Sequence, residues 1–548
     1  MRVINRSIFT VLMVSLIFAG FAPSYQVVRA QAPPPPASPT QAPASSTPPD
    51  RKAYTDANRI TDPKKNIEAL EKFLADFPKS QNVYAAHGSL MSALIKNQPE
   101  QKEKILLHAQ RAIDTAPEYT RRQTCNQIAT DLIEAGLLDK AEEFAAKGLA
   151  IAEEEQSKAL RQSRASYETI IGRIHLKSGK TKEAENAFKA AYDAFPFVDA
   201  NPTTLRTAAL GLAELAEKEG NYDQALTYLS AAAISGRPDA SARARLETAY
   251  RKTHQDSLAG LDEMLDAKYE EEFPSPINAE SYKPTSSRSE RTVLSEVFTG
   301  SGCPPCVAAD LAFDAFLKRY RNKDVIVLMY HQHIPLPDPM TNPSTQTRAK
   351  YYNVRGVPSF AIDGDSSNSG GGPRNGAYEV YDRLSPIIEK QLEAAAGADI
   401  KLHADLAGAV VKVTANVANV KPESAELRLQ LALVEDGLRF NGENGIRFHP
   451  MVVRSLAGEN AGGFALDRSK LSPIEWKFDL KAIAEELKKH LDDFEKSRVD
   501  DKYTFSEKKH AINPGNLTVV AFVQDDKTRQ VLQTVSLKIG SLPTVSAK

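Results

Sequence analysis

Cysteine and tryptophan are scarce in this chain, which has three cysteines and one tryptophan among 548 residues. So few thiols exclude a disulfide-dense scaffold and a four-thiolate zinc site. Neither sign of charge is in excess: 69 basic and 70 acidic residues leave a net charge of −1. The chain has no basic tract, so nucleic acid is not an expected partner. The only long apolar run, residues 8–22, is shorter than the ~20 residues that a membrane-spanning helix needs.

The N-terminal region has the pattern of a secretory signal. Basic residues precede the apolar run, and Val28-Arg29-Ala30 offers small or apolar side chains at the two positions that signal peptidases read. We therefore expect residues 1–30 to be a signal peptide, with an uncleaved anchor as the alternative. The protein is then exported to the periplasm or cell envelope of a bacterium, with no membrane span after cleavage. Residues 31–50 are rich in proline and should form an extended tether.

Two of the three cysteines stand together in Cys303-Pro304-Pro305-Cys306. A β-type apolar run precedes them, and apolar residues at helical spacing follow them. This order places Cys303 at a helix N-terminus, where the helix dipole and unpaired N–H groups stabilise the reactive thiolate. A half zinc site and a purely structural link are the competing interpretations. The absence of a second cysteine pair argues against the zinc site. A purely structural disulfide usually closes a longer loop than these two cysteines would, which argues against the structural link.

A second motif, Gly356-Val357-Pro358-Ser359, follows later in the chain. With the cysteine motif and the strands and helices expected between them, it makes residues 289–397 resemble the thioredoxin superfamily. The resemblance implies that Pro358 follows a cis peptide bond beside the active-site disulfide. It also implies that Val357 and Pro358 present backbone to an extended substrate.

This region departs from the thioredoxin pattern in several ways. Gly302 stands where the family usually has tryptophan before the first cysteine, and Glu296 is the nearest candidate for the family's buried acid, although strand alternation could point it away from the thiols. The proline-rich segment 331–345 is longer than a minimal thioredoxin needs. We expect only a Gly/Ser-rich loop, without a final strand, between Gly364 and Tyr378.

Residues 51–255 show helical periodicity and an internal repeat. Gly136, Gly179 and Gly220 recur at spacings of 43 and 41 residues, and each is followed five residues later by alanine. These offsets resemble the tetratricopeptide repeat, a stack of paired helices whose concave face binds peptides or proteins; a plain helical bundle is the alternative. Cys125 shares an apolar helical face in this region, so we expect a buried structural thiol.

The rest of the chain completes a multidomain prediction. Residues 256–288 should form a connector, and residues 398–542 alternate like strands, with a helix inserted near residues 479–494 and a hairpin around Asp525. We expect a mainly-β, sandwich-like domain of immunoglobulin type there, followed by a tail, 543–548. The predicted fold is thus an all-α superhelix, an α/β thioredoxin-like unit and a β-sandwich.

The predicted function is thiol-disulfide exchange on protein substrates or redox partner proteins. Cys303 would be the nucleophile and Cys306 the resolving thiol, with Pro304 and Pro305 fixing the turn and Glu296 as a candidate accessory acid. The only redox group required is the Cys303–Cys306 disulfide, without a separate cofactor or metal. The direction of electron flow, the clients and the oligomeric state are left open.

Two alternatives from other classes remain. Two thiolates with imidazole suit Cu(I), so Cys303, Cys306, His331 and His333 could form a copper-binding or chaperone site. Alternatively, the thioredoxin-like unit is a non-catalytic assembly module of the cell envelope.

Overall fold

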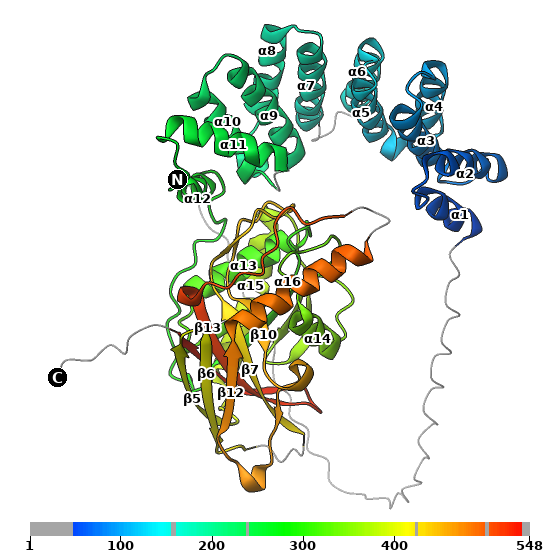
Figure 1. Ribbon diagram of the computed structural model, residues 1–548. Helices are drawn as coiled ribbons and strands as arrows, with labels where there is room; N and C mark the ends of the chain where they lie inside the picture. The colour runs from blue at the N-terminus through cyan, green and yellow to red at the C-terminus, as the bar shows by residue number, and fades with distance from the viewer. Residues whose placement is uncertain (1–47, 155–159, 237–239, 422–425, 499–502, 540–548) are drawn as a thin grey trace, which may run out of the picture. The chain divides into compact units, whose positions relative to one another are not determined.

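The computed structural model describes residues 48–154, 160–236, 240–421, 426–498 and 503–539 (Figure 1). The expected signal, nearly all of the tether and the expected tail lie outside these residues. Within the described segments, no helix has both the length and the apolar character needed to cross a bilayer.

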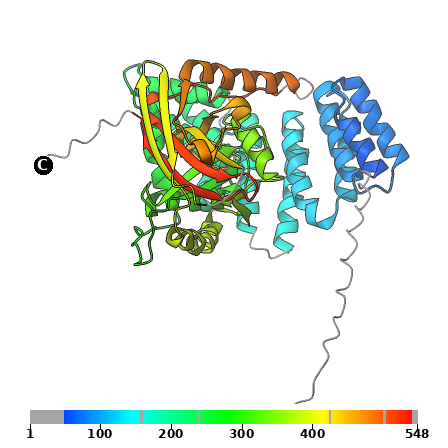
Figure 2. The same ribbon diagram turned by 90° about the horizontal axis from the view of Figure 1, so that it is seen from below.

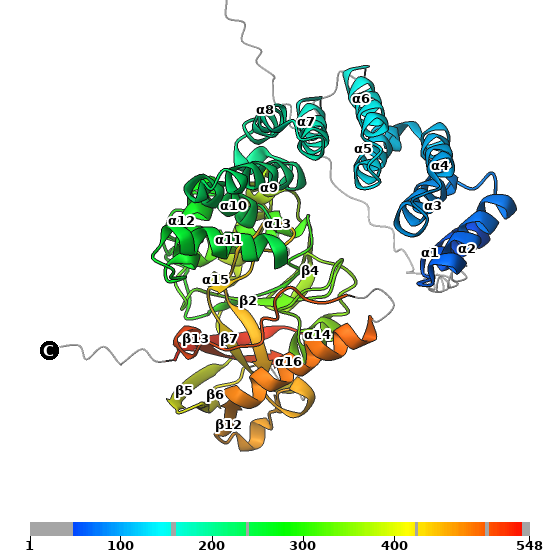
Figure 3. The same ribbon diagram turned by 45° about the horizontal axis from the view of Figure 1, so that its top comes forward.

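The N-terminal part of the described chain is entirely helical. Its elements are α1 (Pro49–Asn58), α2 (Pro63–Asp76), α3 (Val83–Asn97), α4 (Lys102–Thr115), α5 (Glu118–Glu134), α6 (Leu138–Glu154), α7 (Leu160–Lys177), α8 (Thr181–Tyr192), η1 (Phe197–Asp199), α9 (Pro202–Lys218), α10 (Tyr222–Ile234), α11 (Ala240–Thr253) and α12 (Leu261–Glu272). Consecutive helices pack in antiparallel pairs that lie side by side (Figure 3).

The repeated glycines make the same turn three times. Gly136, Gly179 and Gly220 have φ values of 70°, 75° and 73°, a left-handed conformation that glycine adopts without steric cost. In each turn the next residue's N–H donates to a carbonyl five residues earlier, which closes the preceding helix. The alanines five residues after these glycines are fully buried, so the predicted internal repeat is confirmed for these three helix pairs.

The C-terminal part is a mixed α/β region. Its elements are β1 (Val293–Thr299), α13 (Cys306–Arg319), β2 (Val325–His331), α14 (Pro343–Tyr352), β3 (Ser359–Ile362), β4 (Asp365–Ser369), η2 (Arg374–Gly376), α15 (Ala377–Glu393), β5 (Asp399–Ala407), β6 (Val410–Ala418), β7 (Leu427–Glu435), β8 (Leu438–Arg439), β9 (Phe448–His449), β10 (Val452–Leu456), η3 (Glu459–Ala461), β11 (Phe464–Ala465), η4 (Arg468–Lys470), β12 (Ile474–Asp479), α16 (Leu480–Ser497), η5 (Pro514–Asn516), β13 (Leu517–Asp525) and β14 (Val531–Lys538).

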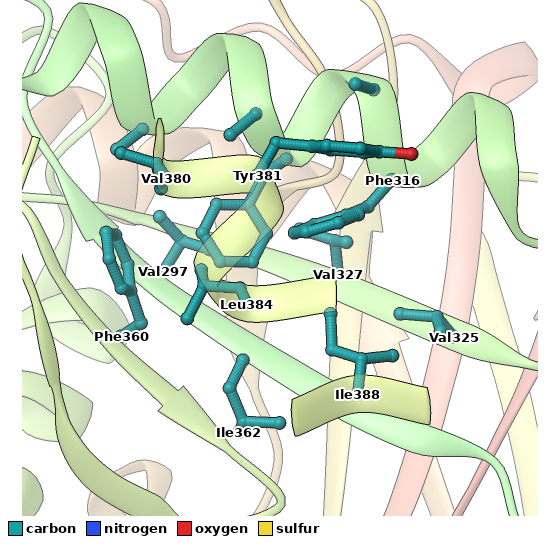
Figure 4. Close-up of a cluster of buried hydrophobic side chains, with 14 of the residues drawn as sticks. Val297, Phe316, Val325, Val327, Phe360, Ile362, Val380, Tyr381, Leu384 and Ile388 are labelled. Carbon is teal, nitrogen blue, oxygen red and sulfur yellow. The ribbon is translucent and has the colours of Figure 1, made fainter. Parts of the chain in front are cut away.

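Strands β1 to β4 form the part of the sheet that carries the cysteine motif. Strand β1 pairs parallel to β2 and antiparallel to β3, and β3 pairs antiparallel to β4. The expectation of a loop without a strand between Gly364 and Tyr378 is wrong, because this segment contains β4. The polar residues of β4 are mostly exposed at the sheet edge, so the sequence shows no apolar alternation there. Helices α13 and α15 cover one face of these strands through a core that includes Val297, Phe316 and Leu384 (Figure 4).

The β-rich part does not form a separate sandwich. Its strands extend the same sheet in the order β14-β13-β7-β10-β2-β1-β3-β4, so the sheet crosses the predicted boundary at residue 398. The junction pairs Val452 of β10 with Met329 of β2 in parallel. A buried ion pair, Arg291 to Asp363 at 2.8 Å, adds to the joint, and Arg291 also donates to the Val531 carbonyl.

Both faces of the extended sheet are covered. Helix α14 packs on one face, against apolar side chains of β1, β2, β7, β10 and β13. On the other face, the three-stranded sheet β12-β6-β5 packs on β7 and β13, beside the region covered by α13 and α15. Figure 2 shows the yellow hairpin of β5 and β6 beside the red strands β13 and β14. The predicted sandwich packing therefore exists, but one of its two sheets continues into strands β1 to β4, which carry the cysteine motif.

Candidate functional site

The two cysteines form a disulfide at the turn between β1 and α13. Their Cα atoms are 5.3 Å apart, and the Cys306 N–H donates to the Cys303 carbonyl at 3.1 Å. Cys303 lies just before the helix, whose first residue is Cys306. Pro304 and Pro305 are exposed, whereas Cys303 is 1% exposed and Cys306 is fully buried. The prolines thus form the outer surface of the turn, and the disulfide lies beneath it.

The proline loop faces the disulfide. The Val357–Pro358 peptide bond is cis, as the thioredoxin resemblance implies. The Val357 carbonyl oxygen lies 3.7 Å from Cys303 Sγ. A backbone carbonyl of this loop is therefore next to the sulfur expected to react. The role of Val357 and Pro358 in substrate binding remains a prediction.

The long segment after β2 folds over the cysteine turn. Asp338 is its anchor: one carboxylate oxygen accepts the Ser301 N–H at 2.6 Å and lies 2.8 Å from His331 Nδ1. Leu336 lies directly on Gly302, where an added Cβ would come within 2.9 Å of the Leu336 Cβ. Leucine from this loop therefore packs at the position where the thioredoxin pattern has an aromatic side chain.

A buried polar cluster lies behind the turn. Asp310, one helical turn after Cys306 on α13, accepts a hydrogen bond from the Thr299 hydroxyl at 2.7 Å. Burial raises the pKa of Asp310 to about 7, with the Thr299 hydrogen bond and nearby His331 opposing the rise. Burial also opposes ionisation of Asp338, but His331 and the N–H groups of Ser301 and Met340 hold the pKa of Asp338 well below its usual value.

Asp310 was missed at the sequence level. Its signal is its spacing of four residues from Cys306, which puts both side chains on one helical face. A carboxyl group in an otherwise apolar stretch of that helix is the second signal. Neither signal alone distinguishes it from a solvent-facing acid.

Glu296 is not the acid beside the thiols. It lies on β1 with the side chains that face α14, whereas Thr299, which contacts Asp310 of α13, is on the opposite face. Its carboxylate pairs with Arg348 at 2.6 Å and accepts a hydrogen bond from the Tyr352 hydroxyl at 2.7 Å. Arg348 also donates to Gln524 of β13. Strand alternation therefore directs Glu296 into a buried network that links β1 through α14 to β13.

The histidines proposed as copper ligands have other contacts. His331 pairs with Asp338, and the His333 ring lies 4.0 Å from the Phe494 ring and accepts the Asp338 N–H through Nδ1. Among the described residues, no three histidine, cysteine or acidic side chains are grouped to hold a metal ion. The set Cys303, Cys306, His331 and His333 is thus not assembled, because His331 at the end of β2 pairs with Asp338 and His333 packs against Phe494 of α16.

Cys125 is a free thiol that is fully buried on α5. Burial raises the pKa of this thiol. The expectation of a buried thiol in the helical region is confirmed.

Comparison with known proteins finds no matching family model and no matching curated protein. Among solved structures, HBP35 of Porphyromonas gingivalis aligns at 14% identity over 48% of this chain and 80% of its own, with a TM-score of 0.31. BtubC (BKLC) from P. vanneervenii aligns at 18% identity over 44% and 99%, with a TM-score of 0.27. PilF of Pseudomonas aeruginosa aligns at 16% identity over 41% and 94%, also with a TM-score of 0.27. These values are too low to assign a fold or a function.

Proposed function

We propose that the protein is an exported thiol-disulfide oxidoreductase acting on protein substrates. The observation that carries the proposal is the Cys303–Cys306 disulfide, closed across two prolines before α13, with the Val357 carbonyl at 3.7 Å from Cys303 Sγ. The parallel β1–β2 pair and antiparallel β3–β4 pair supply the frame that the thioredoxin resemblance requires.

The proposed chemistry exchanges two electrons. In the reducing direction, the Cys303 thiolate attacks a substrate disulfide, which forms a mixed disulfide and releases one substrate thiolate. Cys306 then loses its proton and attacks Cys303 Sγ, which releases the second substrate thiolate. The substrate gains two electrons, and the Cys303–Cys306 disulfide re-forms. The oxidising direction runs the same steps in reverse.

The experiment is to trap the mixed disulfide in the full-length protein. A Cys306→Ser variant lacks the resolving thiol and should accumulate covalent complexes through Cys303, detectable by mass spectrometry after alkylation. A Cys303→Ser variant is the matched control and should trap far fewer clients. The absence of mixed disulfides with Cys306→Ser, together with no insulin reduction by the native protein, would contradict the proposal.

The helical repeats are proposed to recruit the client. A groove of about 1090 Å³ runs along α3 and α5 and is bounded by the end of α1 and the start of α2; it is lined largely by uncharged polar side chains such as Asn66, Ser92, Gln123 and Gln127. Amide and hydroxyl groups of this kind can hydrogen-bond an extended backbone. Gly88 lines this groove with open space at its Cβ position. Gly88→Trp in the Cys306→Ser background should therefore fill the groove and reduce the set of trapped clients, whereas an unchanged set would remove recruitment from the proposal.

A non-catalytic envelope assembly protein is the second candidate. The near-complete burial of both sulfurs favours it, because a substrate thiol cannot reach a buried disulfide without local opening. In that case, both cysteine variants would trap nothing.

A further inference from the structure

The cysteine turn is crossed by a segment far away in sequence, residues 441–447, which we call the cover segment. The Asn444 side-chain amide donates to the carbonyls of Gly300 and Cys303, each at 3.4 Å, and its backbone N–H donates to the Ser301 carbonyl at 3.1 Å. Gly442 lies so close that an added Cβ would be 2.5 Å from the Ser301 carbonyl oxygen. The cover segment therefore binds the backbone of the residues that lead into Cys303.

The other edge of the cover segment is attached to α10 of the repeat region and to α12, the helix that follows the repeats. Arg447, which is buried, pairs with Asp266 of α12 at 2.7 Å. The Tyr269 hydroxyl of α12 donates to the Gly445 carbonyl at 2.9 Å. Asn441 donates to the Ala233 carbonyl at the end of α10, at 2.7 Å. Both ends and the middle of the segment are thus held by helices outside the sheet.

Tyr269 also holds a second loop at the disulfide. Its hydroxyl accepts a hydrogen bond from Arg374 at 3.3 Å, and Arg374 further donates to the carbonyls of Phe273 and Pro274. Residues 370–372 precede Arg374 and lie against the cysteine turn: the Gly372 N–H donates to the Pro305 carbonyl at 2.8 Å. An added Cβ at Gly371 would come within 2.7 Å of Pro358 Cγ. One hydroxyl group therefore joins two of the segments that surround the disulfide.

We propose that the cover segment is an autoinhibitory contact, anchored on α12 through Tyr269 and Asp266, that keeps the disulfide from reacting until the anchor is released. This proposal rests on the proposed oxidoreductase function. Both sulfurs are buried while the prolines between them are exposed, so reaction requires that an adjoining segment move. Because the anchor lies on the helix that follows the repeats, a partner that displaces α12 would open the redox site.

The test measures how fast the disulfide of the full-length protein is reduced by a water-soluble phosphine. In this reaction one phosphine and one water give a phosphine oxide and two thiols, so no catalytic activity of the protein is involved. Alkylation and mass spectrometry of Cys303 and Cys306 report the rate. Tyr269→Phe removes only the hydroxyl and keeps the ring in its apolar cluster.

A matched control lies in the same apolar cluster. Tyr250 is equally buried and donates its hydroxyl to the Ala259 carbonyl at 2.9 Å, away from the cover segment. Tyr269→Phe and Asp266→Asn should each speed reduction by on the order of tenfold, the size expected when one or two hydrogen bonds holding a local closed state are lost. Tyr250→Phe should leave the rate within about twofold of the native protein.

A second measurement guards against general unfolding. Hydrogen exchange should rise in Tyr269→Phe at residues 441–446 and 300–303, while β1 and β2 stay protected. Equal reduction rates in Tyr269→Phe, Asp266→Asn and the native protein would overturn the proposal, as would faster exchange throughout the sheet. Faster reduction in Tyr269→Phe, with no client trapped by Cys306→Ser even when it is combined with Tyr269→Phe, would support the cover and contradict the oxidoreductase. Trapping with unchanged reduction rates would do the opposite.

Discussion

The carboxyl group of Asp310 is the clearest single-residue feature of the site. It is buried on α13 and accepts a hydrogen bond from the Thr299 hydroxyl, and burial raises its pKa from 3.8 to about 7. The folded state therefore holds a proton on this group between about pH 4 and pH 7, whereas the unfolded chain does not. The stability that this group contributes is fully present below about pH 4 and is lost as the pH rises through 7.

Asp310→Asn should remove this pH dependence. The amide oxygen keeps an acceptor for Thr299 but does not ionise. Each pKa unit corresponds to about 1.4 kcal/mol, so the variant should gain stability over the native protein as the pH rises from 4.5 to 7.5. Urea unfolding at both pH values, with the disulfide kept oxidised, measures the difference. Parallel pH dependence in the two proteins would show that Asp310 is ionised in the fold.

At the residue scale, the sequence predicted the Cys303–Cys306 disulfide and the cis bond before Pro358, where chemistry and spacing coincide. The cysteine motif and the Gly356-Val357-Pro358-Ser359 loop are short patterns whose parts are recognised without knowing the fold. The prediction that Glu296 lies beside the thiols was wrong, because an isolated acid in a strand does not reveal which face of the strand is turned to α13. That information comes from the partners Arg348 and Gln524, which are distant in sequence.

At the scale of elements, the helix pairs depend on close backbone approach around Phe188. This ring is fully buried on α8, between Gly172 of α7 and Gly211 of α9. A Cβ at Gly172 would lie 2.6 Å from the Phe188 ring, and one at Gly211 would lie 2.4 Å from it. The two glycines therefore make room for one aromatic side chain that joins three consecutive helices.

Gly211→Ala should destabilise the helical region despite the better helix propensity of alanine. Overpacking of this kind typically costs about 1–3 kcal/mol. Gly88, a helical glycine of α3 with nothing within 4 Å of its Cβ position, is the matched control. Gly88→Ala should stabilise by up to about 1 kcal/mol through helix propensity alone. Thermal unfolding followed by circular dichroism compares the two, and equal effects in both variants would contradict the packing around Phe188.

Helices and strands could be predicted where a regular spacing of apolar residues or a characteristic turn residue marks them. The repeat glycines, the helix at residues 479–494 and the hairpin around Asp525 all have such marks, and the structure contains α16 and the β13–β14 pair there. Strand β4 has none, because its exposed Asp, Ser and Asn residues at the sheet edge give no apolar alternation. Alternation also shows which face of a strand is buried, but not which strand lies beside it.

At the scale of the whole molecule, the domain organisation depends on which strands lie side by side, and the sequence does not show this. The sequence favoured a separate sandwich after residue 398, yet β10 pairs with β2 and makes one sheet. The same assembly brings residues 441–447 across the cysteine turn and joins them to α12. Besides the Val357–Pro358 loop, the environment of the disulfide depends on residues 331–338, 370–372 and 441–447, and the sequence alone did not place these three segments at the site.

The proposed function requires that Cys303 and Cys306 cycle between disulfide and dithiol. Equilibrating the full-length protein in thiol redox buffers, followed by alkylation and mass spectrometry of both cysteines, gives the midpoint potential of the pair. We expect one two-electron transition with a midpoint between roughly −270 and −120 mV, the range of dithiol oxidoreductases. A pair that stays oxidised to below about −300 mV, as structural disulfides do, would contradict it.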